Sequence, residues 1–486
     1  MVCGLLLSSY LIKQLGDTEY GLYQTVSAFA TYLVMLEFGI GTVMSRNISL
    51  CRGKGETDKI KNNVSTLWFT AIALSIVIVA VSVVFYFNIG NIYRNSMSLD
   101  QVAYAQKIFV IITGYLISSF LINTLNGFLL GMENYTFAQK INILKIIVRT
   151  SLLVALISVK PAAISIVIVD LFVSCLILFT TFITCKTKYD IKLRLKYFDK
   201  AILKASLPLC LALLLQSIVN QANSSIGKLI IGIQLSLESV ALYSVAQYLY
   251  SIISTMATIP ISMYIPQVAK NMASGLTGKD LTKTLVQPCR LVTIIAGTVL
   301  FGFVAVGRQF IELFYGAEKV EAWIYALILI IPMFVNMTTG ININVLDVAN
   351  KRLTRSLSLL GTAVLNIIIT LLLIPHFGVL GAALGTSTSL ILGNILVMNI
   401  YYKKVMKLSV IWLYIQAYKG LLPFQIISAI ISFVVAKFIP NVLVSMLAGG
   451  VLYLSILAIL VMLFGLNEEE KKIVEKIKNK VIKRGV

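Results

Sequence analysis

Five charged residues lie inside long apolar stretches of the sequence: Glu37, Lys145, Arg149, Asp170 and Lys228. A charge within the hydrocarbon of a bilayer costs roughly 2.5–3.5 kcal/mol on insertion scales, so each of these residues is a candidate for function. Lys145 and Arg149 are four residues apart, which places them on one face of a helix. Guanidinium and ammonium groups bind phosphate, and we therefore expect this pair of cations to hold a phosphate-containing ligand.

A structural role is the alternative for each of these cations. Arg149 lies nine residues beyond Lys140, or about 14 Å along a helix axis, so its side chain reaches the membrane interface only with difficulty. In the alternative, Lys145 extends to the interface and Arg149 pairs with a carboxylate that holds two helices together. Lys228 lies about four residues from the end of its apolar stretch, so it can extend to the interface instead of binding a ligand.

The two buried acids, Glu37 and Asp170, are natural ligands for a coupling ion such as H⁺ or Na⁺ in a transporter. A different interpretation is a salt bridge with a basic residue, or a cap at a helix break near Gly39 and Gly41. We expect no other cofactor. The six cysteines are scattered without metal-ligand spacing, so the sequence predicts no metal site.

Polar side chains repeat at helical spacing in three apolar stretches. They are Tyr115, Ser119, Asn123 and Asn126; Gln216, Asn220, Ser224 and Lys228; and, more loosely, Asn336, Thr339 and Asn344. A helix surrounded by lipid would not carry such a stripe, so we expect a wet interior. The substrate contacts predicted there are Asn123, Asn126, Gln216, Asn220 and Lys228, beside Arg149 and Lys145. The alternative is hydrogen bonding between helices in a dry interior.

These residues must be positioned by membrane helices. The mean hydropathy is +0.91, 58% of the residues are hydrophobic and only 13% are charged, which predicts an all-α polytopic membrane protein. We expect about fourteen transmembrane helices. They cover residues 2–12 (partial), 20–43, 64–87, 107–130, 141–158, 162–184, 203–232, 239–266, 286–306, 322–345, 355–374, 379–402, 420–439 and 443–465. The first is too short to cross a bilayer, which indicates a partial helix or a missing native start.

The positive charges orient the chain. Assigning the loops after even-numbered spans and the C-terminal tail to the cytoplasm places 33 of the 41 Lys and Arg on that side, with Lys145 and Arg149 included, and seven on the other, while Lys228 lies within a span. This asymmetry follows the positive-inside rule, so the net charge of +21 does not predict binding of nucleic acid. We expect a multi-pass protein of the cell's inner (cytoplasmic) membrane with both termini in the cytoplasm.

An internal repeat predicts how the spans are grouped. Leu15, Leu22 and Tyr23 match Leu235, Leu242 and Tyr243 at a constant offset of 220, which indicates two six-helix lobes in a parallel pseudo-twofold repeat. The predicted parts are an N-terminal lobe (1–184, first helix truncated), a basic cytoplasmic linker (185–202), a C-terminal lobe (203–402), two extra transmembrane helices (403–465) and an amphipathic cytoplasmic tail (466–486).

The tail has a helix start signal. Asn467 can cap a helix, and Glu470 follows three residues later. Ile473, Ile477 and Val481 form an apolar stripe among lysines, which suits a helix in the membrane interface. A frayed polar tail is the alternative.

The sequence lacks common catalytic motifs. It contains no HExxH, Walker A or GxSxG pattern, so we expect a transporter without catalytic residues rather than an enzyme. A membrane sugar polymerase or ligase would need a sizeable catalytic outer loop. The longest outer loop, residues 88–106, contains one acid, Asp100.

Four stretches, in this order and spacing, resemble a known family. They are LGDTEYGLYQTVSAFATYLVMLEFGIGTVMSR (15–46), YFDKAILKASLPLCLALLLQSI (197–218), residues 311–318 and IPHFGVLGAALGTSTS (374–389). Together they cover about residues 5 to 405 and are similar to the bacterial polysaccharide flippases of the O-antigen-unit type. That family belongs to the multidrug/oligosaccharidyl-lipid/polysaccharide exporter superfamily. Glu37 stands where an Asp is more usual in the family, and Gly227 stands where many members carry an Asp.

The resemblance implies two six-helix lobes around a cation-lined cavity that works by alternating access. It also implies an undecaprenyl-pyrophosphate-linked oligosaccharide as substrate and a role in cell-surface polysaccharide biosynthesis. The expected partners are this lipid-linked oligosaccharide and membrane lipids, and polysaccharide polymerase machinery is a further candidate. The first alternative is a cation-coupled multidrug exporter of the same superfamily, which should prefer acids and aromatic residues in its cavity. The second alternative is the membrane sugar polymerase or ligase.

Overall fold

The computed structural model describes residues 2–94, 96–189, 191, 193–349, 352–468, 470 and 471. These residues form an all-helical fold, and each of the fourteen predicted spans overlaps one helix or a series of consecutive helices. Within the described ranges, ten helices are long and apolar enough to cross a membrane, or up to twelve if each of two bent pairs is one span. The all-α membrane fold is therefore confirmed, with a span count by this criterion below the fourteen expected.

Packing divides the chain into two units, Met1–Ser244 with Thr370–Ala382 and Val245–Ile369 with Ala383–Val486. The helices that begin in unit 1 are α1 (Val2–Leu33), α2 (Ile40–Gly53), α3 (Thr57–Ile92), α4 (Leu99–Gly131), α5 (Tyr135–Val159), α6 (Ala163–Tyr189), α7 (Lys200–Gln234) and α8 (Leu237–Ala273). The two lobes proposed from the sequence are defined by the internal repeat rather than by packing, and they stay a prediction.

The remaining helices begin in unit 2. They are α9 (Gly278–Thr284), α10 (Val286–Tyr315), α11 (Ala322–Thr338), α12 (Ile341–Val348), α13 (Arg352–Phe377), α15 (Met398–Val405), α16 (Val410–Tyr418), α17 (Leu422–Lys437) and α18 (Val442–Leu460), while α14 (Val379–Leu390) begins in the short piece of unit 1. Two pairs, α11 with α12 and α16 with α17, are each bent by 47°.

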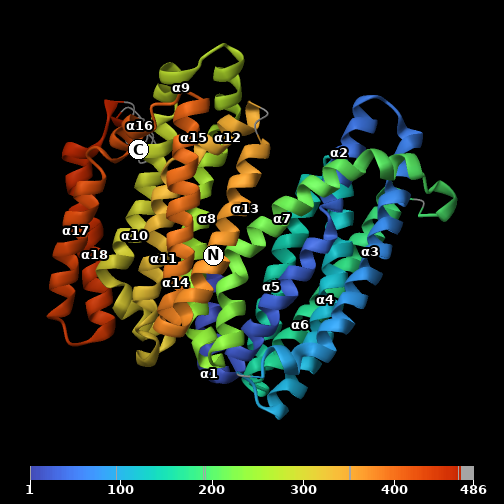
Figure 1. The fold of residues 1–486 in the computed structure, drawn as a ribbon, viewed down its shortest axis with the longest axis horizontal. Helices are drawn as coiled ribbons and strands as arrows, with labels where there is room; N and C mark the ends of the chain where they lie inside the picture. The colour runs from blue at the N-terminus through green and yellow to red at the C-terminus, as the bar shows by residue number, and fades with distance from the viewer. Residues whose placement is uncertain are drawn as a thin grey trace, which may run out of the picture. The chain divides into compact units, whose positions relative to one another are not determined.

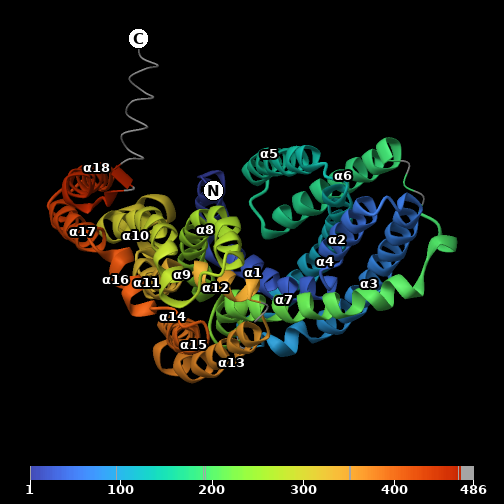
Figure 2. The same cartoon turned by 90° about the horizontal axis from the view of Figure 1, so that it is seen from above.

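Within unit 1, α3, α4 and α6 run side by side, and α5 packs against α6 (Figures 1 and 2). Large side chains of α4, including Phe109, Phe120 and Phe128, are buried between these helices. On α3, Val84 and Phe87 point outward and are 65% and 72% exposed. Apolar side chains exposed in this way suit a helix that faces lipid, because lipid tails are as apolar as the side chains themselves.

α1 consists of two helices that meet at Gly16, whose φ of 74° and ψ of 172° are not helical. The apolar helical segment from Leu6 to Gly53 has 48 residues. A straight helix of that length would measure about 72 Å, more than twice the roughly 30 Å thickness of bilayer hydrocarbon. The chain must therefore turn, and Gly16 confirms a break at the polar segment between the first two predicted spans.

A second break follows α1. A short 3₁₀ turn covers Val34–Glu37, and Phe38 and Gly39 then adopt left-handed backbone angles with φ of 50° and 63° before α2 begins. This region is unfavourable for a bulky residue such as Phe38 and accessible to glycine. The stretch around Glu37 is therefore a discontinuous helix, a feature that transporters use near binding sites.

Glycines bring α2 against α4. A Cβ atom on Gly41 would lie 2.6 Å from the backbone oxygen of Asn123, and one on Gly127 would lie 2.1 Å from the backbone oxygen of Gly41. Only residues without a side chain allow two helix backbones to approach this closely. The contact brings the polar stripe of α4 next to the break at Phe38.

We expect Gly41→Ala to lower the free energy of unfolding by about 1–3 kcal/mol, because the added methyl group pushes α2 away from the backbone of α4. Gly53→Ala in the same helix is the matched control, since a Cβ atom there meets nothing within 4 Å. Thermal unfolding of the detergent-solubilised protein measures both effects. Equal stability of the two variants would show that the α2–α4 contact is not tight.

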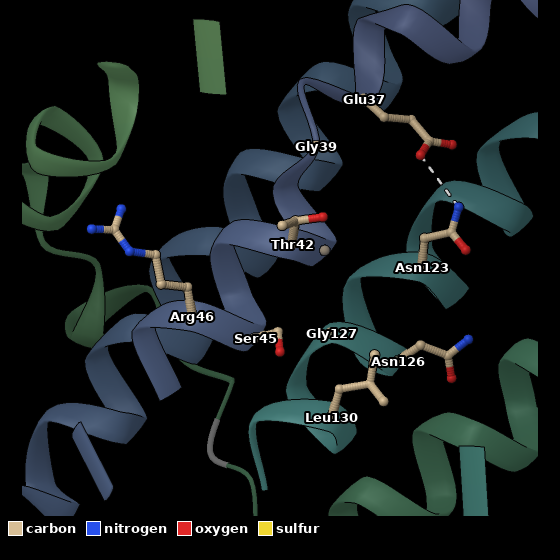
Figure 3. Close-up of a pocket in the computed structure, with 10 residues that line it drawn as sticks. Glu37, Gly39, Thr42, Ser45, Arg46, Asn123, Asn126, Gly127 and Leu130 are labelled. Carbon is tan, nitrogen blue, oxygen red and sulfur yellow. Dashed lines mark hydrogen bonds between the residues drawn. The ribbon is translucent and has the colours of Figure 1, made fainter. Parts of the chain in front are cut away.

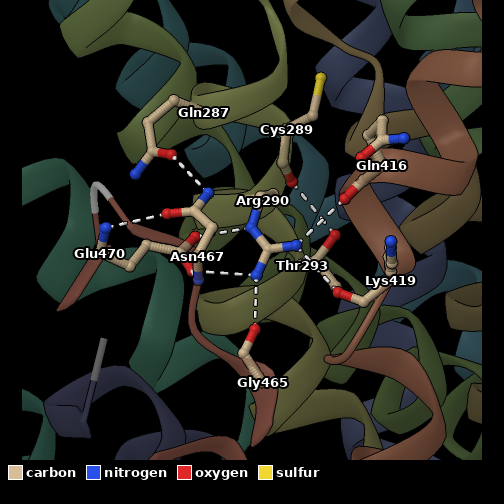
Figure 4. Close-up of polar contacts among 9 residues, drawn as sticks. All are labelled: Gln287, Cys289, Arg290, Thr293, Gln416, Lys419, Gly465, Asn467 and Glu470. Carbon is tan, nitrogen blue, oxygen red and sulfur yellow. Dashed lines mark hydrogen bonds and ion pairs between the residues drawn. The ribbon is translucent and has the colours of Figure 1, made fainter.

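Unit 2 is organised around α10, which packs against α11, α16, α17 and α18 (Figure 1). Near the start of α10, Arg290 is buried and all five of its N–H donors are used (Figure 4). Two bonds go to the Glu470 carboxylate at 2.7 and 2.9 Å. The others go to the backbone oxygens of Gln416, Lys419 and Gly465 at 3.1, 2.9 and 2.8 Å. The Arg290 side chain thus joins three segments: the end of α16, the backbone at Gly465 and the start of the C-terminal tail at Glu470.

The start of the C-terminal tail has the predicted cap. The backbone N–H of Glu470 donates to Asn467 Oδ1 at 2.8 Å, and the backbone N–H of Asn467 donates to Glu470 Oε2 at 2.9 Å. This reciprocal pair confirms the capping box expected from the sequence. The predicted apolar stripe at Ile473, Ile477 and Val481 lies outside the described residues.

Candidate functional site

A cavity of about 540 Å³ lies in unit 1 beside the break between α1 and α2 (Figure 3). Its lining comes from the break, from α2 and from α4: Glu37, Gly39, Gly41, Thr42, Ser45, Arg46, Asn123, Asn126, Gly127 and Leu130. Three predicted site residues, Glu37, Asn123 and Asn126, therefore share one cavity. Its volume suits a small-molecule headgroup, since ligand pockets commonly measure about 300–1,000 Å³.

The acid of this cavity interacts directly with one of its two amides. The Asn123 side-chain amide donates to Glu37 Oε2 at 3.3 Å. The side-chain oxygen of Asn126 is buried and has no hydrogen-bond partner within the described structure. A buried polar atom of this kind requires water or a ligand to satisfy it. These residues can therefore offer hydrogen bonds to hydroxyl or amide groups of a bound molecule.

Arg46 is a lining residue that the sequence analysis did not select. It lies on α2, is exposed, and in Figure 3 its guanidinium lies on the opposite side of the view from the Glu37 carboxylate. The described residues include no ion pair to Arg46. The cavity thus combines an acid at the helix break with a cation one to two turns further along α2. From the sequence, Arg46 resembled an ordinary basic residue at the end of an apolar stretch.

Arg149 forms an ion pair with Asp170. Arg149 Nε lies 2.5 Å from Asp170 Oδ1 and Arg149 Nη2 lies 3.0 Å from Oδ2, so the pair is bidentate. The side chains are 33% and 11% exposed, which leaves part of the guanidinium accessible. This is the pairing named in the structural alternative, and it joins α5 to α6. It compensates the charges of both residues, although the exposed edge of Arg149 can still reach a ligand.

Lys145 lies one turn before Arg149, and its Nζ is 5.9 Å from the centre of the Tyr115 ring. Tyr115 and Asn123 are eight residues apart on α4, about 12 Å along the axis. The polar stripe of α4 therefore leads from the cation pair at one end to the cavity at the other. Lys145 and Arg149 are not part of the cavity lining.

Lys228 forms a separate group on α7. Its Nζ donates to Gln24 Oε1 at 3.2 Å, and Gln24 Nε2 donates to the Tyr20 hydroxyl at 2.7 Å. Its partner is thus a neutral amide of α1. The side chains of Gln216 and Asn220, also predicted on this helix, lie outside the described residues.

Comparison with solved structures identifies the fold. The chain is similar to "Lipid II flippase MurJ, inward closed conformation", with a TM-score of 0.73, 16% identity, and coverage of 95% of this chain and 96% of that one. It is also similar to an inward-facing multidrug resistance MATE family transporter of the MOP superfamily, with a TM-score of 0.61, 14% identity, and coverage of 85% and 93%. The fold is that of MOP superfamily transporters.

A match between the sequence and a family model identifies the family of this chain. A family model described as polysaccharide biosynthesis protein matches residues 1–272, more than half of the chain. The chain belongs to this polysaccharide biosynthesis protein family, as the resemblance implied. A search of curated proteins finds no match.

Proposed function

We propose that the protein is a flippase that moves an undecaprenyl-pyrophosphate-linked oligosaccharide across the cytoplasmic membrane by alternating access. The family match supports a role in polysaccharide biosynthesis, and the MOP fold supports transport rather than catalysis. The observation that carries the proposal is a cavity in a membrane-spanning unit whose lining offers a cation, amides and hydroxyls together. A sugar diphosphate has matching acceptors and hydroxyl groups.

Each group of the site has a proposed role. Arg46 binds the diphosphate, and Asn123 and Asn126 bind sugar hydroxyls within the cavity. Lys145 and the exposed edge of Arg149 provide a second cationic position along the α4 stripe, where the diphosphate binds at another stage of the cycle. The lipid chain stays in the bilayer, because a polyprenyl tail is stabilised by hydrocarbon.

Glu37 is the better of the two candidates for a coupling ion. Asp170 already has Arg149 as its partner, whereas Glu37 has only the neutral Asn123 amide among the described residues. A carboxylate at a discontinuous helix can bind H⁺ or Na⁺ as the cavity changes its access. Glu37 and Arg46 in one cavity would also let ion release accompany diphosphate binding.

A cation-coupled multidrug exporter is the second candidate function. Glu37 in the cavity favours it, and the MATE transporter supports it at the level of the fold. Arg46 in the same lining disfavours it, because a guanidinium repels the cationic compounds that an acidic cavity attracts. Drug resistance of cells that overproduce the protein distinguishes the two functions.

We expect Arg46→Ala to reduce export of the surface polysaccharide about tenfold or more, because one charge-assisted contact to phosphate contributes about 1.5–3 kcal/mol. Arg46→Lys should retain part of the export, since it keeps the charge but loses the planar fork. Export is measured in a strain that lacks the chromosomal gene and carries each variant. Lys54→Ala, at the exposed end of the same helix, is the control. Full export by Arg46→Ala would remove the diphosphate role from this residue.

A further inference from the structure

A groove of about 320 Å³ lies between α3 and α4 in unit 1. None of its lining residues lines the cavity of the candidate functional site. Among the side chains of the groove, Val83 and Phe87 of α3 are 48% and 72% exposed, and Val110 of α4 is 58% exposed. Phe87 also belongs to the surface of α3 that suits contact with lipid. The groove is therefore continuous with this surface and opens towards lipid.

The inner wall of the groove is made of packed aromatic side chains. Phe109 lines the groove and is only 1% exposed. Its ring contacts the Phe85 ring edge-on, with ring centres 4.8 Å apart, and Phe85 contacts Tyr93 in the same way at 6.5 Å. Side chains packed at this density hold fixed positions. The groove is thus a feature of the folded unit and not a gap between mobile side chains.

One hydroxyl group in this lining lacks a partner. Ser82 is 4% exposed, and its Oγ forms no hydrogen bond within the described residues. Two nearby hydroxyls on the same helices use a backbone carbonyl of their own helix. Ser75 Oγ donates to the Ala71 oxygen at 2.9 Å, and Thr113 Oγ1 donates to the Phe109 oxygen at 2.9 Å. Because an unsatisfied buried hydroxyl costs free energy, Ser82 requires an acceptor from outside the protein.

The depth of the groove in the membrane indicates which acceptors can reach it. In the orientation predicted from the loop charges, α3 ends and α4 begins at the outer side. Ser82 lies ten residues before Ile92, and Phe109 lies ten residues after Leu99, so both are about 15 Å from the outer ends of their helices. The predicted span 64–87 ends about 7.5 Å beyond Ser82. The ester groups of outer-leaflet phospholipids lie near this boundary of the hydrocarbon.

We propose that the groove binds one acyl chain of an outer-leaflet glycerophospholipid, and that Ser82 Oγ donates to the ester carbonyl of that chain. The apolar walls contact the hydrocarbon, and the carbonyl oxygen is the acceptor that the hydroxyl lacks. A polyprenyl chain would fit the same walls, but it consists only of carbon and hydrogen and leaves Ser82 unsatisfied. The ester lipid is therefore the favoured occupant, and this inference does not depend on the proposed transport.

The test compares two phospholipids that differ only in the acceptor. The purified full-length protein in detergent is titrated with a diacyl phosphatidylethanolamine and with its dialkyl ether analogue of equal chain length, and bound lipid is counted by native mass spectrometry. We expect the first ester lipid to bind about fivefold more tightly than the first ether lipid, a factor that one hydrogen bond of average strength supplies. Equal affinities would overturn the proposal, because the groove would then be an ordinary contact with lipid.

Matched variants locate the bound lipid. Ser82→Ala should remove the preference for the ester lipid, whereas Ser75→Ala should keep it, since Ser75 is buried on the same helix and already has its partner. Val83→Trp should fill the groove and remove the preference as well. Val84→Trp is its control, because Val84 is exposed but does not line the groove. A preference that survives both Ser82→Ala and Val83→Trp would place the lipid elsewhere and overturn the proposal.

Competition with undecaprenyl phosphate distinguishes the two kinds of chain. This lipid is added to the complex of the wild-type protein with the diacyl phospholipid, at an equal concentration of the two lipids. We expect most of the phospholipid to stay bound, because the polyprenyl chain offers Ser82 no acceptor. Displacement of most of the phospholipid would assign the groove to a polyprenyl chain and overturn the proposal.

Discussion

Arg290→Ala should lower the free energy of unfolding by about 3–5 kcal/mol, the usual cost of removing one partner from a buried ion pair. The side chains of Arg290 and Glu470 are each only 5% exposed, so the remaining carboxylate would have little access to water. The substitution also removes the donors to the last carbonyls of α16 and to Gly465. These carbonyls carry the partial negative charge of helix ends, which the guanidinium compensates.

Thermal unfolding in detergent measures this effect, and Arg308→Ala is the matched control. Arg308 lies on the same helix but is exposed, so its removal should change stability by less than about 0.5 kcal/mol. The loss of stability in Glu470→Gln should fall between those of the two arginine variants, because the amide keeps the shape of the contact and loses its charge. Equal unfolding temperatures for the two arginine variants would show that the Arg290 network does not hold unit 2 together.

Arg149→Ala should reduce export about thirtyfold or more, and Arg149→Ala/Asp170→Asn should not restore it. Loss of a charge-assisted contact in a partly buried site costs about 2 kcal/mol or more, which corresponds to this factor. The single variant leaves the Asp170 carboxylate, 11% exposed, without its cation. The double variant also removes the charge of that carboxylate. It therefore no longer leaves an unpaired charge in the protein, while the phosphate contact proposed for Arg149 is still absent.

The comparison separates the two roles proposed for Arg149, phosphate binding and helix packing. Export by each variant is measured in the strain without the gene, and the amount of folded protein is measured by size-exclusion chromatography in detergent. Asp170→Asn alone should retain folded protein and part of the export. Recovery of wild-type export in the double variant would mean that Arg149 serves only to hold α5 against α6.

Local features of this chain were predictable from its sequence. Hydropathy predicted the helices, because each span must satisfy its own backbone hydrogen bonds in lipid. Gly39 and Gly41 indicated the helix break beside Glu37, and Asn467 with Glu470 indicated the cap of the tail. Each of these features depends on residues within a few positions of one another, so the sequence contains the whole signal.

Contacts between distant segments were not predictable. Arg46 lies in the cavity only because α2 starts anew after the break and packs on the glycines of α4. Arg290 finds Glu470 at a separation of 180 residues, so it resembled any basic residue beside a cytoplasmic loop. Lys228 faces Gln24 because of the rotation of α7 about its own axis, which residue types alone do not fix.

The most direct test of the proposed transport is to measure in which leaflet of the membrane the lipid-linked sugar resides. Intact spheroplasts of a strain without the gene are treated with an impermeant reagent that oxidises sugars, and the labelled share of the lipid-linked oligosaccharide is measured. We expect almost no labelling in this strain, substantial labelling when the wild-type protein is restored, and little labelling with Arg46→Ala. Equal labelling with and without the protein would contradict the proposed flippase function.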